Sequence, residues 1–72
     1  MEFDFSKLLG RIVEKYGTRS AFAEVWGVND SYLSNRLNNK VNFDSKDIHK
    51  CCLLLDIQPI EIPVYFFTLK VR

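Results

Sequence analysis

Residues 18–40 constrain the fold most, because their spacing is that of two short helices joined by a tight turn. Thr18 is expected to cap the first helix with its hydroxyl. Gly27 is expected to end that helix in the left-handed conformation that glycine adopts without steric cost. Asn29 is then the expected N-cap of the second helix. Apolar residues at helical spacing predict the buried sides of the two helices: Phe22, Ala23 and Trp26, then Leu33 and Leu37.

The small side chain of Ala23 adds a steric condition. Two helices that cross steeply over a short turn need a residue without bulk where they touch. The motif has a small residue, a turn glycine four positions later and an aliphatic residue six positions beyond the glycine. This combination predicts a helix-turn-helix.

The sequence before the motif predicts a first helix over residues 5–16. Asp4 is its expected N-cap, because a carboxylate is favourable beside the positive end of a helix dipole. Gly17 is expected to end it. One face of this segment is apolar and the other charged, which is typical of a helix that covers a core.

A fourth helix is predicted over residues 46–55, with Asp44 or Ser45 as its N-cap. Asp47 is expected in its first turn, as a favourable acid near the helix N-terminus. Phe43 is expected to pack back into the core just before this helix. The predicted buried side, with Leu53 left on the surface, is Ile48, Cys51, Cys52, Leu54 and Leu55.

The last part of the chain predicts a short fifth helix followed by an extended tail. Pro59 suits the first turn of a helix that ends between residues 62 and 65. Residues 64–72 are rich in aromatic and β-branched side chains and are expected to be extended. Phe66 is expected to close the core, whereas Tyr65 and Phe67 are candidates for an interface. Residues 68–72 are expected either to fray as a flexible tail or to add a strand at a dimer interface.

Length and charge limit the function. With 72 residues the chain is one small domain, and its net charge is only +1. Residues 18–40 carry three basic side chains against two acidic ones. Phosphate contacts from basic residues supply the sequence-independent part of DNA affinity. We therefore expect modest DNA affinity unless the protein dimerises or acts with a partner.

Several classes of function are not expected. The two cysteines, Cys51 and Cys52, are neighbours on a predicted helix and diverge, so neither a disulfide between them nor a metal site with His49 and Asp47 is expected. No pattern of catalytic residues, cofactor site or pocket for a small-molecule substrate is evident, so an enzyme is not expected. No membrane-spanning run or signal segment is recognised, and a reduced, cytoplasmic setting is expected.

Three segments together resemble a family of small Cro-like proteins from temperate phages of Gram-positive bacteria. They are the opening MEFDFSKLLGRIVEKYGT, the central FAEVWGV…YLSNRLNNK and the closing LLLDIQPIEIPVYFF, which together span nearly the whole chain. The resemblance implies an all-α, lambda-repressor-like helix-turn-helix domain of four to five short helices over residues 1–72.

The same resemblance implies a transcriptional regulator of the lysis–lysogeny switch. Its expected role is that of an antirepressor or co-regulator that binds the N-terminal DNA-binding domain of the phage CI-type repressor in the bacterial host cell. Operator DNA is a second partner that the resemblance allows. The alternative is an autonomous Cro-like repressor that binds a specific DNA sequence by itself.

Carried over onto this chain, the resemblance assigns DNA or repressor contacts to side chains of the motif. The residues expected to meet phosphates are Arg19 and Ser20. Those expected to face the major groove are Asn29, Asp30, Ser31, Tyr32 and Asn35. Those expected to flank the second helix and approach the backbone are Arg36 and Lys40. An amide such as that of Asn35 can pair with adenine through two hydrogen bonds.

Most of these residues also have a purely structural interpretation. Asn29 can act only as a helix cap, Arg19 is an ordinary solvated residue at a helix start, and the remaining polar side chains can form a simple exterior. Asp30 departs from the usual pattern, because a carboxylate is repelled by phosphates unless it accepts a hydrogen bond from cytosine. It can be a favourable first-turn acid. With Glu24 it can also recognise a basic DNA-binding face on another regulator, and this is the antirepressor hypothesis.

Overall fold

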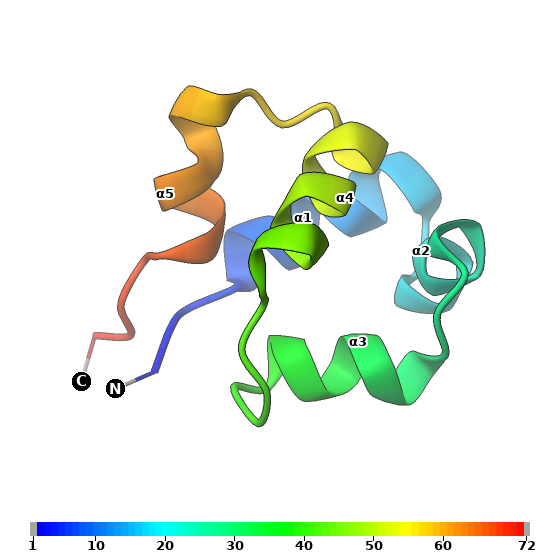
Figure 1. Cartoon of the computed structure of the whole chain (residues 1–72), viewed down its shortest axis with the longest axis horizontal. Helices are drawn as coiled ribbons and strands as arrows, with labels where there is room; N and C mark the ends of the chain where they lie inside the picture. Colours follow the sequence, from blue (N-terminus) through cyan, green and yellow to red (C-terminus); the bar gives the residue numbers. More distant parts are fainter. Residues whose placement is uncertain (1, 72) are drawn as a thin grey trace.

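Local capping signals determine where the helices of this computed structural model begin and end. The structure describes residues 2–71. Its elements are α1 (Ser6–Tyr16), α2 (Arg19–Trp26), α3 (Asp30–Leu37), α4 (Ser45–Leu55), the 3-10 turn η1 (Pro59–Glu61) and α5 (Ile62–Phe66). The predicted all-α fold of short helices, with the helix-turn-helix as its second and third members, is confirmed (Figure 1).

The caps of the helix-turn-helix are those predicted. The Thr18 hydroxyl accepts a hydrogen bond from the Ala21 amide at 3.0 Å, and the Asn29 side-chain oxygen accepts one from the Tyr32 amide at 2.7 Å. Gly27 ends α2 at φ 89° and ψ 25°, in the left-handed region. The three residues 27–29 therefore suffice to connect α2 to α3.

The start of α1 differs by one residue from the prediction. Phe5, and not Asp4, occupies the N-cap position. The Asp4 carboxylate still accepts a hydrogen bond from the Ser6 amide at 2.8 Å, from one position further out. Gly17 ends α1 at φ 85°, as predicted.

Helix α4 is fixed at both ends. At its start Asp44 and Asp47 form a reciprocal capping box, in which each carboxylate accepts a hydrogen bond from the other residue's amide, at 2.8 and 3.1 Å. At its other end α1 supplies the donors that the last carbonyls lack. The Tyr16 hydroxyl donates to the Leu54 carbonyl at 2.7 Å, and the Arg11 Nε donates to the Leu55 carbonyl at 2.9 Å.

The core lies where α1 packs against α2, α4 and α5. Its buried apolar members are Phe5, Leu8, Ile12, Phe22, Ala23, Leu33, Cys51, Leu55, Ile57 and Phe66. Phe43 packs between Phe5 and Phe66, with ring centroids 5.1 and 5.3 Å away. The predictions that Phe43 and Phe66 join the core and that Leu53 remains exposed are confirmed.

The sequence-based prediction of an extended segment is wrong over residues 64–66. Residues 64–66 are helical, because α5 continues to Phe66 and so buries that side chain. Within the tail, Leu69 forms an antiparallel bridge with Phe3 of the same chain. The Asp4 amide donates to the Thr68 carbonyl at 2.7 Å, and the Lys70 amide donates to the Glu2 carbonyl at 3.1 Å. Residue 72 of the predicted tail lies outside the described residues.

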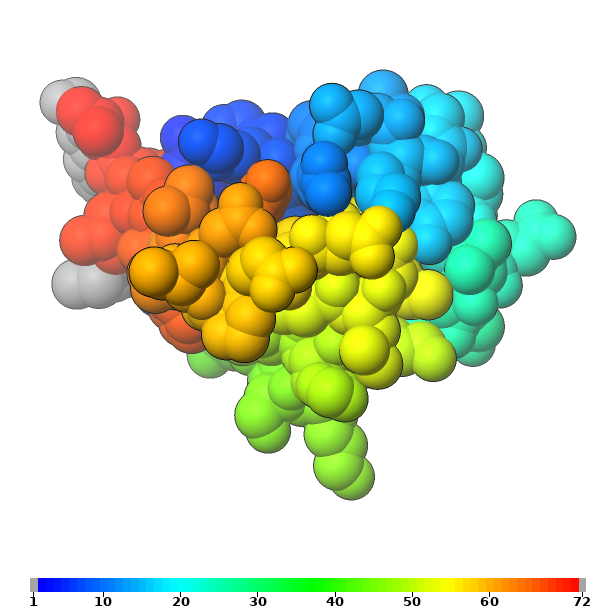
Figure 2. Space-filling model, turned by 90° about the horizontal axis from the view of Figure 1, so that it is seen from above, coloured from blue at the N-terminus to red at the C-terminus, as the bar shows by residue number. Residues whose placement is uncertain are grey.

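The two ends of the chain therefore lie side by side, at the edge of the molecule next to α5 and far from α2 (Figure 1). Helix α3 lies along one side of the molecule. The opposite side, seen in Figure 2, is formed by α1, α2, the end of α4 and the segment from η1 to α5. Within residues 2–71 no helix has the length and apolar character needed to cross a membrane.

Candidate interaction face on the helix-turn-helix

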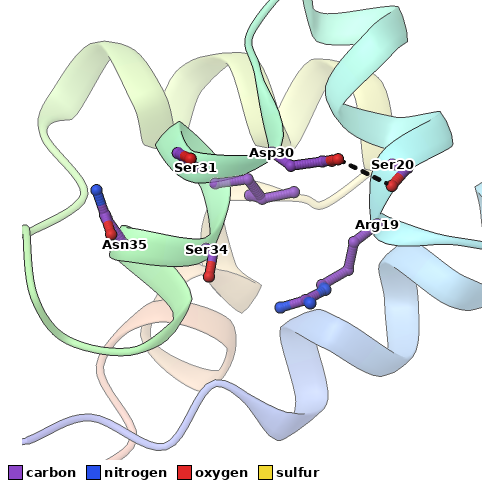
Figure 3. A pocket seen from close by; sticks show the side chains of 7 residues that line it. Arg19, Ser20, Asp30, Ser31, Ser34 and Asn35 are labelled. Carbon is purple, nitrogen blue, oxygen red and sulfur yellow. Dashed lines mark hydrogen bonds between the residues drawn. The ribbon is translucent and has the colours of Figure 1, made fainter.

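A polar hollow of about 300 Å³ lies between the start of α2 and the outer side of α3. The side chains that line it are Arg19, Ser20, Asp30, Ser31, Leu33, Ser34 and Asn35 (Figure 3). Five of the nine residues predicted to bind DNA or a repressor are thus brought together. We call this surface the outer face. Ser34 was not predicted, although it lies three positions after Ser31 on the same helix, a spacing that could have found it.

The two helices meet across the outer face at Asp30 and Ser20. Their side-chain oxygens lie 3.2 Å apart, with the Ser20 hydroxyl donating to the Asp30 carboxylate (Figure 3). Asp30 also occupies the first turn of α3, where a negative charge is favourable. Within residues 2–71 its carboxylate has one partner, and the residue is exposed, so it can still accept hydrogen bonds from a second macromolecule.

Asn29 has a structural role. Its side-chain oxygen accepts a hydrogen bond from the Tyr32 amide, which fixes the orientation of the amide and leaves one lone pair of that oxygen and the amino group for an external partner. An adenine needs both a donor and an acceptor from the same amide. The cap therefore restrains the Asn29 amide, whereas Asn35 has no hydrogen bond to its side chain within residues 2–71.

Arg36 and Tyr32 do not point outward, in contrast to the prediction. The Arg36 Nε donates to Oδ2 of Asp47 at 2.8 Å, and the Tyr32 hydroxyl donates to Oδ1 of the same carboxylate at 2.5 Å. The Arg36 guanidinium also lies 3.5 Å from the centre of the Tyr32 ring. The side chains of Tyr32 and Arg36 are therefore both directed at α4. Arg36 is long enough to reach the Asp47 carboxylate, which would otherwise be buried without a cation.

Asp47 is the centre of this cluster. It lies in the first turn of α4, as predicted, but no local pattern indicated that its side chain would be buried against α3. Only 3% of its surface is exposed. Burial opposes ionisation of the carboxylate, but hydrogen bonds from Tyr32, Arg36 and the Asp44 amide outweigh it and lower the pKa of Asp47 below its ordinary value of 3.8. The hydrogen bond to Asp47 in turn raises the pKa of the Tyr32 phenol.

A series of aromatic contacts holds α3 from the other side. Ring centroids lie 5.3 Å apart from Tyr16 to Phe22, 5.7 Å from Phe22 to Trp26, and 5.6 Å from Trp26 to Tyr32. These contacts link α1, α2 and α3 in sequence, and each pair of this kind stabilises by about 0.5–1.5 kcal/mol beyond its burial. The outer face is thus carried on a helix whose orientation is fixed by two sets of contacts.

The charge that the motif offers to a partner is balanced. Within residues 2–71, an ion pair engages Arg36 but neither Arg19 nor Lys40. Lys40 is exposed just after α3, where its amide donates to the Asn35 carbonyl at 2.8 Å. The two remaining cations of the motif are matched in number by two exposed acids, Glu24 and Asp30. The outer face is therefore polar and mixed in charge.

Neither cysteine supports a reactive site. Burial raises the pKa of both the Cys51 and the Cys52 thiols, which keeps them protonated. In the part of the chain that the structure describes, no three His, Cys, Asp or Glu side chains are grouped so that they could hold a metal ion.

Comparison with known protein families matches residues 1–69 to the family described as "Protein of unknown function (DUF739)". The chain belongs to this family. A search of the curated proteins gives no match.

Among solved structures, this DUF739 member is similar to the modulator of repression of the temperate bacteriophage TP901-1 from Lactococcus lactis, determined in solution. The two are 42% identical, with a TM-score of 0.84, and the match covers 100% of this chain and 97% of the other. The resemblance to small temperate-phage regulators that the sequence predicted is confirmed. The DUF739 match spans all five helices and both residues of the Phe3–Leu69 bridge.

Proposed function

We propose that this protein is a phage transcriptional regulator of the lysis–lysogeny switch, acting in the cytoplasm of the bacterial host as an antirepressor or co-regulator. In this role it binds the N-terminal DNA-binding domain of a CI-type repressor and has no catalytic step. The observation that carries the proposal is the full-length similarity, at 42% identity, to a phage modulator of repression.

The outer face supports a protein partner on physical grounds. A surface that reads DNA unaided gains much of its affinity from cations that neutralise phosphates. Here Arg36 is neutralised by Asp47, and Asp30 and Glu24 add negative charge. The DNA-binding domain of a repressor presents the opposite surface, rich in basic groups. In the proposed complex, Asp30 approaches that basic surface and competes with the operator for it.

A second candidate function is autonomous, Cro-like binding to operator DNA. The observation that favours it is the position of Ser31 and Asn35 on α3 at the rim of the polar hollow, with Arg19 across the hollow at the start of α2. A recognition helix places its first turns against base edges, while the preceding helix contacts the backbone. If this function holds, Asn35→Ala lowers affinity for one specific operator.

The proposal is tested by reversing the charge at Asp30. Asp30→Lys places a cation against the basic surface of the repressor, and we expect its affinity for the isolated N-terminal domain of the repressor to fall at least tenfold. The measurement is a calorimetric titration without DNA, repeated at two salt concentrations. Competition with labelled operator then shows whether the complex releases the repressor from DNA.

The matched control is Glu14→Lys, which makes the same charge change on an exposed side chain of α1, outside the outer face. This variant should bind the repressor as the natural protein does. Equal affinities of Asp30→Lys and the natural protein would contradict the proposed contact. Salt-dependent binding of the natural protein to one operator, without any binding to the repressor, would establish the second candidate instead.

A further inference from the structure

The side chain of Arg36 is oriented inward, although it lies near the end of α3. A cation near the end of α3 could extend outward and approach a phosphate. Instead its side chain is only 13% exposed and is paired with a carboxylate whose own side chain is 4% exposed. Helix α3 thus contains a cation that is held against α4.

Asp47 holds this cation through a built arrangement of donors. Its two oxygens accept from the Tyr32 hydroxyl, the Arg36 Nε and the Asp44 amide. Arg36 has a second anchor, because its NH1 group donates to the Tyr32 carbonyl at 3.1 Å. Releasing Arg36 would leave a buried carboxylate without its cation, which is unfavourable. A passing phosphate therefore competes poorly for Arg36.

We propose that Asp47 is a specificity-determining residue: by pairing with Arg36 it withholds a phosphate-binding cation from the outer face, so that this face discriminates against DNA and in favour of a protein partner. The inference rests on the proposed function, in which the outer face is the contact surface. It deepens that function by naming the residue that sets the choice of partner. Asp47 acts through Arg36 and touches neither partner, so it is a positioning residue.

The physical consequence is a missing phosphate contact. Each phosphate that a protein neutralises adds about 0.9 to the magnitude of the slope of log affinity against log salt concentration. Neutralising Asp47 leaves the charge of Arg36 uncompensated and free to turn outward. We therefore expect Asp47→Asn to steepen that slope by about one and to tighten binding to DNA of arbitrary sequence about five- to tenfold at low salt.

The test is a double-mutant cycle of the full chain with Arg36→Gln, Asp47→Asn and the double variant. The probe is a short fluorescent DNA duplex of arbitrary sequence, and the readout is anisotropy over a series of salt concentrations. Arg36→Gln alone should change the slope little, because its charge is already paired. In its background Asp47→Asn should lose its effect, because the cation that it releases is absent.

The control for a simple change of net charge is Asp56→Asn. Asp56 is also paired with a cation, Lys15, but at the far end of α4. Asparagine suits its left-handed backbone, so the fold should be retained. This variant removes one negative charge away from the outer face and should leave the slope unchanged.

A tighter DNA complex for Asp47→Asn in both Arg36 backgrounds would overturn the inference, because the gain would then not pass through Arg36. An unchanged slope in folded Asp47→Asn would overturn it as well. Fluorescence of Trp26 verifies the fold, and Asp47→Ser, whose hydroxyl can still accept from the Asp44 amide, replaces Asp47→Asn if that variant unfolds.

The proposed function is tested separately, by titrating the natural protein with the repressor domain. If the natural protein binds the repressor but Asp47→Asn binds DNA no more tightly, the inference alone fails. If Asp47→Asn binds DNA more tightly only when Arg36 is present, the inference that Asp47 withholds Arg36 is supported. If the natural protein then does not bind the repressor, the proposed function is overturned.

Discussion

A buried carboxylate links the stability of this domain to pH, because the pKa of Asp47 in the folded state lies below its ordinary value of 3.8. A group whose pKa is depressed by folding stabilises the protein fully above its unfolded pKa and loses that contribution as pH falls through the folded pKa. We expect the free energy of unfolding to decrease as pH is lowered from about 5 to below 3.8. Urea denaturation at a series of pH values measures this decrease.

Asp47→Asn should flatten that pH dependence and lower the free energy of unfolding at neutral pH by about 1–3 kcal/mol, because the hydrogen bonds to a charged acceptor are weakened. Asp56 provides the comparison. Its pKa is also lowered by Lys15, but the group is exposed to solvent, which screens the interaction. Asp56→Asn should therefore change the curve much less. Identical curves for Asp47→Asn and the natural protein would refute the assignment.

At the scale of helices, the features that the sequence predicted are the helix bounds, which depend on residues close together in the chain. Thr18, Gly27 and Asn29 act within one turn of the chain, so their types alone indicate the bounds of α2 and α3. The pairing of Arg36 with Asp47 spans 11 positions and exists only because α3 and α4 meet in space. No local pattern distinguishes such an arginine from a solvated one. The structure brings five of the nine candidate residues together at the outer face, whereas Arg36 and Tyr32 are directed at α4, which no local pattern could indicate.

The tail shows the same limit in another form. Local sequence preference predicts an extended conformation for residues 64–66, because aromatic and β-branched side chains favour strands. These residues are helical instead, because the helix buries Phe66 against the core. Pro63 is tolerated because it lies in the first turn of α5. Residues 68–70 do extend, but their partner is the N-terminal segment, which no feature of the tail itself could indicate.

The contact between α2 and α3 gives a prediction at this scale. Ala23 is 2% exposed, so Ala23→Leu must insert three carbon atoms where the two helices meet. We expect the free energy of unfolding to fall by about 1–3 kcal/mol. Displacement of α3 should also disturb the Trp26–Tyr32 contact and shift the fluorescence of Trp26. Chemical denaturation followed by that fluorescence measures both effects.

Val25→Leu is the matched control, because it also enlarges an aliphatic side chain of α2 but at a position that is 55% exposed. Its effect should stay within about 0.5 kcal/mol. A variant Ala23→Leu as stable as Val25→Leu would show that the helices do not need a small residue at their crossing.

At the scale of the whole molecule, the two chain ends and the loop between α3 and α4 form one connected unit. Asn39 adopts φ 63° in that loop, and its side chain pairs with both backbone groups of Phe3, accepting from the amide at 2.9 Å and donating to the carbonyl at 3.0 Å. The N-terminal segment is therefore held by Asn39 on one side and by Thr68 and Lys70 on the other. Loss of Asn39 should loosen both ends together.

Asn39→Gly tests this coupling, because glycine accepts the positive φ and removes only the side chain. We expect the free energy of unfolding to fall by about 1–3 kcal/mol for the two hydrogen bonds. Hydrogen exchange should accelerate at the amides of Phe3, Asp4 and Lys70. Asn42→Gly, at an exposed position of the same loop, corrects for the chain entropy that any new glycine adds. Faster exchange at Phe3 with unchanged protection at Lys70 would mean that the C-terminal segment is held independently of Asn39, most directly through Phe3 and Phe67, whose ring centroids lie 5.7 Å apart.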